Sequence, residues 1–174
     1  ALNQFLQDQF EHTICNAVIG NAAELWHLRH SITEGARALG KPIAFDVSVP
    51  RSRIMAFCRA ARAVVDQDFP FLHVVDFGHI ADGGVHFNVI WRNDAALAYD
   101  PAQVQALRDR IYAMVVQDFA GSYSAEHGIG PHNLAYYQQY TPAPVRQLAQ
   151  GVRQLMDPEQ LCGTVDFGLN ATVH

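Results

Sequence analysis

The sequence has few cysteines, few charges and no long apolar run. Its three cysteines, Cys15, Cys58 and Cys162, are far apart and form no CxxC pair. This argues against a disulfide scaffold or a thiolate zinc site and favours a reducing, cytoplasmic compartment. No apolar run reaches the roughly 18–20 residues of a membrane span, and the N-terminus lacks the layout of a signal peptide. The first residue is alanine, so we expect a processed chain or a piece of a longer one.

Composition and net charge narrow the class of protein. Of the 174 residues 49% are hydrophobic and 17% are charged, which excludes a disordered chain and leaves enough apolar surface for a core. Asp and Glu number 17 against 12 Lys and Arg, giving a formal net charge of −5. A mildly acidic chain lacks the basic patches that nucleic acids require. We therefore expect one globular domain over residues 1–174 that does not bind nucleic acid.

Apolar periodicity predicts interleaved helices and strands. The predicted helices cover residues 1–10, 21–39, 53–66, 101–119, 132–140 and 142–156, and the predicted strands cover 14–19, 43–49, 71–80 and 85–91. Asn21 and Ser52 are predicted N-caps, and Pro101 suits the first turn of its helix. The order predicts an α+β fold, a mainly antiparallel sheet flanked by helices.

Two histidines flank a predicted hairpin turn. Asp82-Gly83 between two apolar segments is a strong hairpin signal. With a two-residue turn His79 faces His86 directly, with Cβ atoms roughly 4.5–5.5 Å apart. Asn88 falls on the same face. Two imidazoles so placed can hold one metal ion, or they can be partly buried histidines bonded to their neighbours.

A glycine-flanked loop carries a second group of polar residues. Glu126 and His127 are adjacent between Gly121 and Gly130, and such loops let the backbone approach a ligand closely. Glu126 would complete a two-histidine, one-carboxylate set suited to zinc or another divalent ion. Alternatively, Glu126 pairs locally and His127 is a solvent-exposed loop residue.

Arg29 and Thr33 share a face of the helix predicted over 21–39, because they are four residues apart. A guanidinium with a nearby hydroxyl can clamp a carboxylate. The alternative is that Arg29 pairs with Glu24 or Glu34 on a solvated surface.

Several strings in order make the chain resemble a known family. They are Leu-Trp-His-Leu-Arg (25–29), Phe-Asp-Val-Ser-Val-Pro (45–50), His-Ile-Ala-Asp-Gly-Gly-Val-His-Phe-Asn (79–88), Ala-Glu-His-Gly-Ile-Gly (125–130) and Leu-Met-Asp-Pro (155–158). Together they resemble the C-terminal substrate domain of FAD-linked oxidases of the vanillyl-alcohol oxidase type, in the branch of the D-2-hydroxy-acid dehydrogenases and glycolate oxidases. The resemblance covers nearly the whole chain.

This resemblance implies a metal site and a redox activity. In that family two histidines and a glutamate hold zinc or manganese, and the matching positions are His79, His86 and Glu126. It implies a flavin-dependent oxidoreductase, which oxidises a small D-2-hydroxy acid to the 2-oxo acid with hydride transfer to FAD. The FAD is bound mainly by an N-terminal domain. Nothing here resembles that domain, so we expect this chain to be the C-terminal part of a longer enzyme and to be inactive alone.

The resemblance also implies substrate contacts. Arg29 and Thr33 match the residues that hold substrate, and Asn88 and His127 match further substrate contacts, with His127 as the candidate general base. One departure affects this set, because Ala44 occupies a position where family members often carry a lysine that contacts the substrate carboxylate.

Two other classes of function stay open at this point. The chain could be a metal-binding or partner-binding module without catalysis of its own. It could also be a metal-dependent hydrolase or non-haem iron oxygenase that uses the same two histidines and glutamate. Whether the domain forms a homodimer is also left open.

Overall fold

The computed structural model describes residues 2–9, 17–79 and 81–162, which divide into two compact units, Ala1–Ala38 and Leu39–His174. The first unit contains α1 (Leu2–Gln9) and nearly all of α2 (Ala22–Leu39). The predicted cap of α2 is confirmed, because Asn21 Oδ1 accepts a 2.8 Å hydrogen bond from the Ala23 amide. The strand predicted over 14–19 falls partly outside the described residues, and residues 17–20 form no strand.

An antiparallel sheet forms the centre of the second unit. β1 (Gly40–Ile43) and β2 (Asp46–Ser48) pair with one edge of β4 (Gly84–Arg92), and β3 (Leu72–Phe77) pairs with the other edge. Between β1 and β2, Phe45 and Phe87 exchange backbone hydrogen bonds of 3.0 and 3.2 Å. β1 and β2 are therefore two parts of one line along β4, and the predicted α+β class is confirmed.

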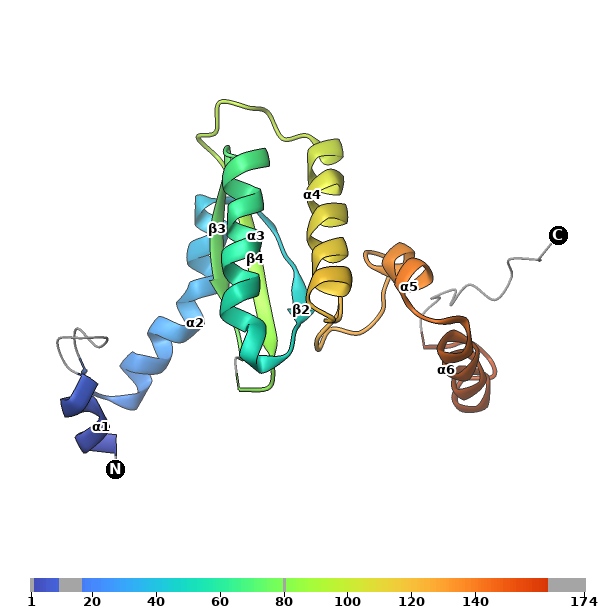
Figure 1. The fold of residues 1–174 in the computed structure, drawn as a ribbon, viewed down its shortest axis with the longest axis horizontal. Coiled ribbons are helices and arrows are strands. Elements are labelled where there is room, and N and C mark those ends of the chain that lie inside the picture. Colours follow the sequence, from blue (N-terminus) through green and yellow to red (C-terminus); the bar gives the residue numbers. More distant parts are fainter. Residues whose placement is uncertain (1, 10–16, 80, 163–174) are drawn as a thin grey trace. The chain divides into compact units, whose positions relative to one another are not determined.

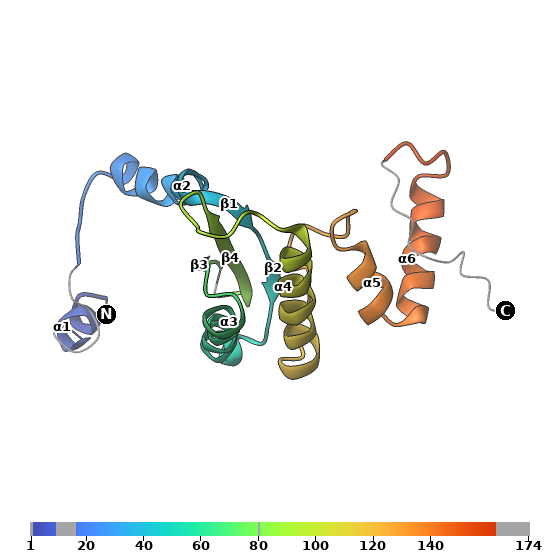
Figure 2. The same ribbon diagram turned by 90° about the horizontal axis from the view of Figure 1, so that it is seen from above.

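Two helices, α3 (Ile54–Asp68) and α4 (Pro101–Ala113), cover the same face of this sheet (Figures 1 and 2). The apolar side chains that alternate along the strands point to these helices, because successive side chains of a strand point to opposite faces. The fully buried side chains between the layers include Phe45, Val47, Phe57, Val65, Phe87, Val89, Leu107, Ile111 and Val115. The opposite face carries Asp46 and Ser48 of β2 and His86 and Asn88 of β4.

The helix ends follow local hydrogen bonding. Asp100 caps α4 by accepting from the Ala102 amide at 2.9 Å, and Pro101 occupies the first turn as predicted. The predicted cap at Ser52 is wrong, because the 3-10 turn η1 (Arg51–Arg53) precedes α3 and no side chain caps that helix. A π-helical turn, η2 (Met114–Asp118), continues α4.

Two more helices follow the loop after η2. They are α5 (Leu134–Tyr140) and α6 (Ala143–Met156), close to the predicted bounds. Tyr136 and Tyr137 of α5 are buried in the core. α6 instead leaves apolar side chains exposed, among them Leu148 and Leu155 at 70% and 80%.

The β3–β4 connection differs from the predicted two-residue turn. Phe77, not His79, pairs with His86, so the connection between β3 and β4 is longer than two residues. The Asp82 carboxylate accepts from the Gly84 amide at 2.8 Å, and the Asp82 amide donates to the His79 carbonyl at 3.1 Å. These bonds widen the turn. The register is shifted by two residues, an even number, so His79 stays on the face of the sheet that carries His86.

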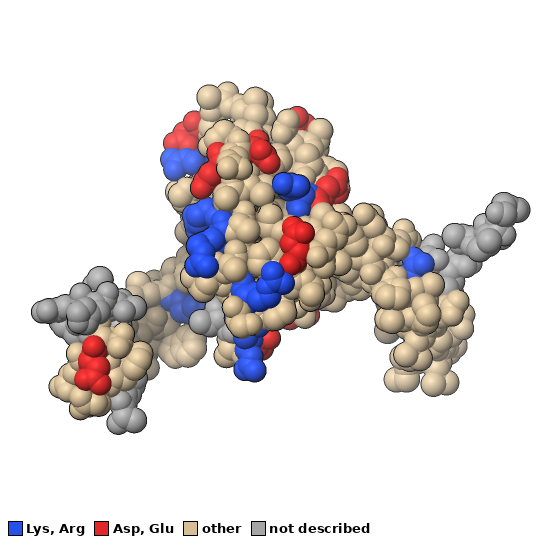
Figure 3. All heavy atoms as spheres, viewed as in Figure 1, with Lys and Arg blue, Asp and Glu red and all other residues tan. Residues whose placement is uncertain are grey.

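Basic and acidic side chains are interspersed over the surface of α3 and α4 seen in Figure 3. Among the described residues, none of the helices is both long enough and apolar enough to span a membrane.

Candidate functional site

A polar pair lies on the sheet face opposite α3 and α4. Asp46 of β2 pairs in register with His86 of β4, and their side chains are only 12% and 17% exposed. Asp46 alternates with the buried Phe45 and Val47, which fixes its carboxylate on the polar face. The Asp46 Oδ1 atom lies 3.7 Å from His86 Nδ1.

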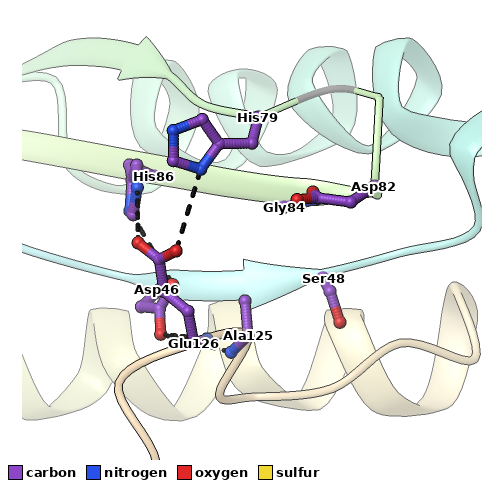
Figure 4. Close-up of a pocket in the computed structure, with 8 residues that line it drawn as sticks. All are labelled: Asp46, Ser48, His79, Asp82, Gly84, His86, Ala125 and Glu126. Carbon is purple, nitrogen blue, oxygen red and sulfur yellow. Dashed lines mark hydrogen bonds and ion pairs between the residues drawn. The ribbon is translucent and has the colours of Figure 1, made fainter.

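Two segments outside the strands add an imidazole and a carboxylate to this pair (Figure 4). The β3–β4 connection supplies His79, whose ring centroid lies 5.8 Å from that of His86. The loop after η2 supplies Glu126, whose Oε1 lies 3.2 Å from His86 Nε2 and whose Oε2 lies 3.7 Å from His79 Nδ1. One potential ligand atom from each of the three residues lies within 4.8 Å of the other two.

The loop that carries Glu126 is attached to β2 at two places. Ser122 exchanges backbone hydrogen bonds of 2.8 and 3.0 Å with Ser48. Further along, Asp46 Oδ2 accepts the backbone amides of Ala125, Glu126 and His127 at 3.2, 2.9 and 2.8 Å. The largely buried Asp46 carboxylate therefore fixes the backbone of the residues that project into the site.

Close approach of the loop requires glycine at position 121. A Cβ there would overlap the Ser48 carbonyl oxygen and lie 2.9 Å from Val49 Cγ1 and 3.0 Å from Val115 Cγ1. Any side chain would push the loop away from β2, because the first obstacle is backbone.

His127 lies beside the same group. Its ring stacks near His86 at a centroid distance of 5.8 Å and an interplanar angle of 21°. Its Nδ1 is 3.4 Å from Asp46 Oδ2 and its Nε2 is 3.7 Å from Glu126 Oε1. The side chain is 67% exposed, so a ligand in solution can reach it.

The donor set of His79, His86 and Glu126 suits a divalent metal ion. Imidazole nitrogen and carboxylate oxygen are the ligands that zinc and manganese accept. Ligands at about 2.1 Å from one ion lie at most about 4.2 Å apart, so these side chains need only small rotations. The three residues line a cavity of about 280 Å³ together with Asp46, Ser48, Asp82, Gly84 and Ala125, which leaves room for further ligands.

A second cavity of about 300 Å³ is lined in part by Asp46 and His127 and extends to Ala44, Arg108, Tyr112 and Tyr123. Burial is the main cause that raises the pKa of both tyrosines. Their phenols therefore stay protonated at neutral pH and can donate hydrogen bonds. The guanidinium of Arg108 donates to the Ala44 carbonyl at 3.2 Å.

The other predicted substrate contacts are Asn88, Arg29 and Thr33. Asn88 lies on β4, two residues beyond His86 and half-buried, but it lines neither of these two cavities. Arg29 and Thr33 are exposed on α2, in the first unit. Their roles stay predictions.

Sequence reasoning gave no role to Asp46. A signal was present, because Asp46 alternates with apolar residues in a strand and so had to share one face with Ser48. A carboxylate on a half-buried strand needs partners, and this requirement marks Asp46 as a candidate site residue.

Comparisons with known proteins agree with the resemblance. A family model described as FAD linked oxidases, C-terminal domain, matches residues 3–164. D-2-hydroxyglutarate dehydrogenase of Xanthomonas citri pv. viticola is 39% identical over 140 residues, which are 80% of this chain and 29% of that protein. The enzyme of the same name from Stutzerimonas stutzeri is 32% identical over 135 residues, 77% of this chain and 28% of that protein. The mitochondrial D-2-hydroxyglutarate dehydrogenase of Bos taurus is 31% identical over 135 residues, 78% of this chain and 23% of that protein. The chain thus spans less than a third of each of these relatives.

Proposed function

Because this chain belongs to the family of FAD linked oxidases, C-terminal domain, we propose that it forms the substrate-binding part of a flavin-dependent D-2-hydroxy-acid dehydrogenase. The enzyme oxidises a D-2-hydroxy acid to the 2-oxo acid and transfers a hydride to FAD. In this proposal an FAD-binding domain precedes residues 1–174 in the whole protein. The exposed apolar side chains of α6 support a larger assembly, because contiguous exposed apolar surface commonly marks an interface.

The observation that carries this proposal is the convergence of His79, His86 and Glu126 beside His127. We propose that the first three hold a zinc or manganese ion. Such an ion, when bound, polarises a coordinated hydroxyl and lowers its pKa, as it does for water. The glutamate would supply a negative charge to the ion, and the two histidines would supply neutral nitrogen donors. Three protein ligands would leave room in the coordination sphere of the ion for a bidentate substrate.

The protein side chains then orient the acid and take its proton. His127 is the proposed general base, since a neutral imidazole nitrogen can accept a proton and this ring is exposed beside the donors. His127 Nδ1 lies 3.4 Å from Asp46 Oδ2, and this carboxylate would stabilise the imidazolium. The hydroxyl proton is therefore proposed to go to Nε2. Arg29, Thr33 and Asn88 are the proposed contacts to the substrate.

The relatives suggest which acid to test first. Three of them carry the name D-2-hydroxyglutarate dehydrogenase, so D-2-hydroxyglutarate is the first substrate to test. Its second carboxylate is compatible with the cavity that Ala44 and Arg108 line. We also propose a cytoplasmic location, supported by three scattered cysteines without CxxC pairs.

The test uses the whole gene product purified with its flavin. Addition of D-2-hydroxyglutarate, but not the L enantiomer, is expected to bleach the visible flavin spectrum and to reduce an artificial dye. His86→Ala should abolish tight metal binding and most turnover, whereas an exposed histidine away from the site, His73→Ala on β3, should retain both. Near-normal metal content and turnover in His86→Ala would overturn the proposed metal centre.

Elemental analysis separates the two alternative classes of function. Zinc or manganese in a protein without flavin or dehydrogenase activity would favour a binding module. Redox-active iron on the same two histidines and glutamate would favour an oxygenase.

A further inference from the structure

Asp46 is the most buried charged group of the site, and the proposed metal centre does not count it as a ligand. We propose that Asp46 is a positioning residue that orients the His86 ring toward the metal ion and anchors the Glu126–His127 backbone beside it. This inference rests on the proposed metal centre and adds the residue that assembles it.

The two carboxylate oxygens of Asp46 have different surroundings. Oδ2 accepts three backbone amides, those of residues 125, 126 and 127. Oδ1 is buried and has no hydrogen-bond partner among the described residues. A buried carboxylate oxygen without a donor is costly, so a donor is expected to face it. The nearest candidate is His86 Nδ1 at 3.7 Å, which a small rotation of the ring would bring into hydrogen-bonding range.

The His86 ring lies between two carboxylates. Nδ1 faces Asp46 Oδ1, and Nε2 lies 3.2 Å from Glu126 Oε1, on the side of the donor set. A neutral imidazole binds a metal through one nitrogen only when the other nitrogen carries the proton. Asp46 can only accept a hydrogen bond, so it favours the proton on Nδ1. The Nε2 lone pair is then directed to the ion, in the arrangement common to metal-bound histidines.

Asparagine at position 46 would reverse this preference while keeping the anchor. The three backbone amides require an acceptor, so the side-chain carbonyl of Asp46→Asn should replace Oδ2. The NH₂ group then faces His86 Nδ1 and requires an acceptor there, which moves the ring proton to Nε2. Asp46→Ala instead removes both the ring partner and the loop anchor. The two variants therefore separate ring orientation from loop anchoring.

The experiment measures zinc affinity and amide hydrogen exchange on the whole gene product. Affinity is read by competition with a chromogenic chelator. Exchange is read in the metal-free protein at the amides of Glu126 and His127, because the Ala125 amide also bonds to the Asp46 backbone carbonyl at 3.1 Å and keeps that bond in every variant. Asp46→Asn should bind zinc roughly 10- to 100-fold more weakly while these amides stay protected. Asp46→Ala should lose both affinity and protection. Asp94→Asn removes the same charge at an exposed Arg92–Asp94 pair and should match the wild type.

The possible results separate this inference from the proposed function. Asp46→Asn with zinc affinity within threefold of wild type would overturn the orienting role of Asp46 and leave the metal centre standing. Loss of amide protection in Asp46→Asn equal to that in Asp46→Ala would show that the carboxylate acts through the loop alone, which also overturns the orienting role. A wild-type whole gene product that binds neither zinc nor manganese would overturn the metal centre and this inference together.

Discussion

Gly121→Ala tests whether the close approach of the site loop to β2 stabilises the fold. The new methyl would overlap the Ser48 carbonyl oxygen and press on Val49 and Val115. It would therefore break the two backbone hydrogen bonds between Ser48 and Ser122, each contributing about 1 kcal/mol net. Overpacking against the two valines adds about 1–3 kcal/mol. Reduced entropy of the unfolded chain offsets about 0.4–1 kcal/mol, so the expected net loss is about 2–4.6 kcal/mol.

Urea denaturation followed by circular dichroism measures this loss. With a slope of about 2 kcal/mol per molar urea, the unfolding midpoint should fall by about 1–2 M. Gly151→Ala is the matched control, because a Cβ in α6 meets nothing within 4 Å. It should stabilise the helix by about 0.5–1 kcal/mol. Equal midpoints for Gly121→Ala and wild type would refute the idea that the loop needs glycine there.

Three further outcomes are expected. Glu126→Gln removes the anionic oxygens that face both imidazoles, so it should weaken zinc binding at least roughly tenfold in a chelator competition. Glu159→Gln, at an exposed position after α6, should leave zinc binding unchanged, and equal losses in both variants would contradict the proposed ligand. Burial, with the nearby Asp76 carboxylate, raises the pKa of the Cys58 thiol. Iodoacetamide should therefore alkylate Cys58 more slowly than the exposed Cys162. Mass spectrometry measures both rates, and equal rates would count against this environment of Cys58. Hydrogen bonds from the backbone amides of residues 162 and 161 lower the pKa of Asp157. The turn after α6 should therefore be stabilised at neutral pH and lose that stabilisation as pH falls through the lowered folded-state pKa. An acid titration followed by NMR tests this, and amide signals of the turn that stay unchanged throughout would disprove the contact.

Local sequence patterns predicted the fold class and the face of the histidine pair but not the hairpin register. Alternation along β4 identifies the polar face of the strand without any tertiary contact. The register depended on the turn, where the Asp82 side chain accepts from the Gly84 amide and competes with a two-residue turn. The Ser52 cap failed for a similar local reason, because the Arg53 amide bonds to the Pro50 carbonyl at 2.7 Å and starts a 3-10 turn first.

The approach of Glu126 to the histidines could not be derived from spacing. It depends on contacts between residues about 80 positions apart, such as those from Asp46 to the Glu126 and His127 amides. No periodicity within a strand or helix reports such a contact, so the residues alone left Glu126 either as a third ligand or as a locally paired side chain, and the family resemblance favoured the first. The alternation of residues along the strand places Asp46 on the polar face, but its partners could not be named for the same reason, since they lie on distant segments.

The π-helical turn η2 has a consequence for tolerated changes in chain length. The Phe119 amide bonds to the Met114 carbonyl five residues back, so this turn accommodates one residue more than an α-helix would. A one-residue deletion at the exposed Gln117 lets ordinary α-helical pairing resume, with little displacement of the segment that follows. The same deletion in the middle of α4 would rotate the helix by about 100° and expose Leu107 or Ile111. Natural insertions and deletions in this helix should therefore cluster at its last turn.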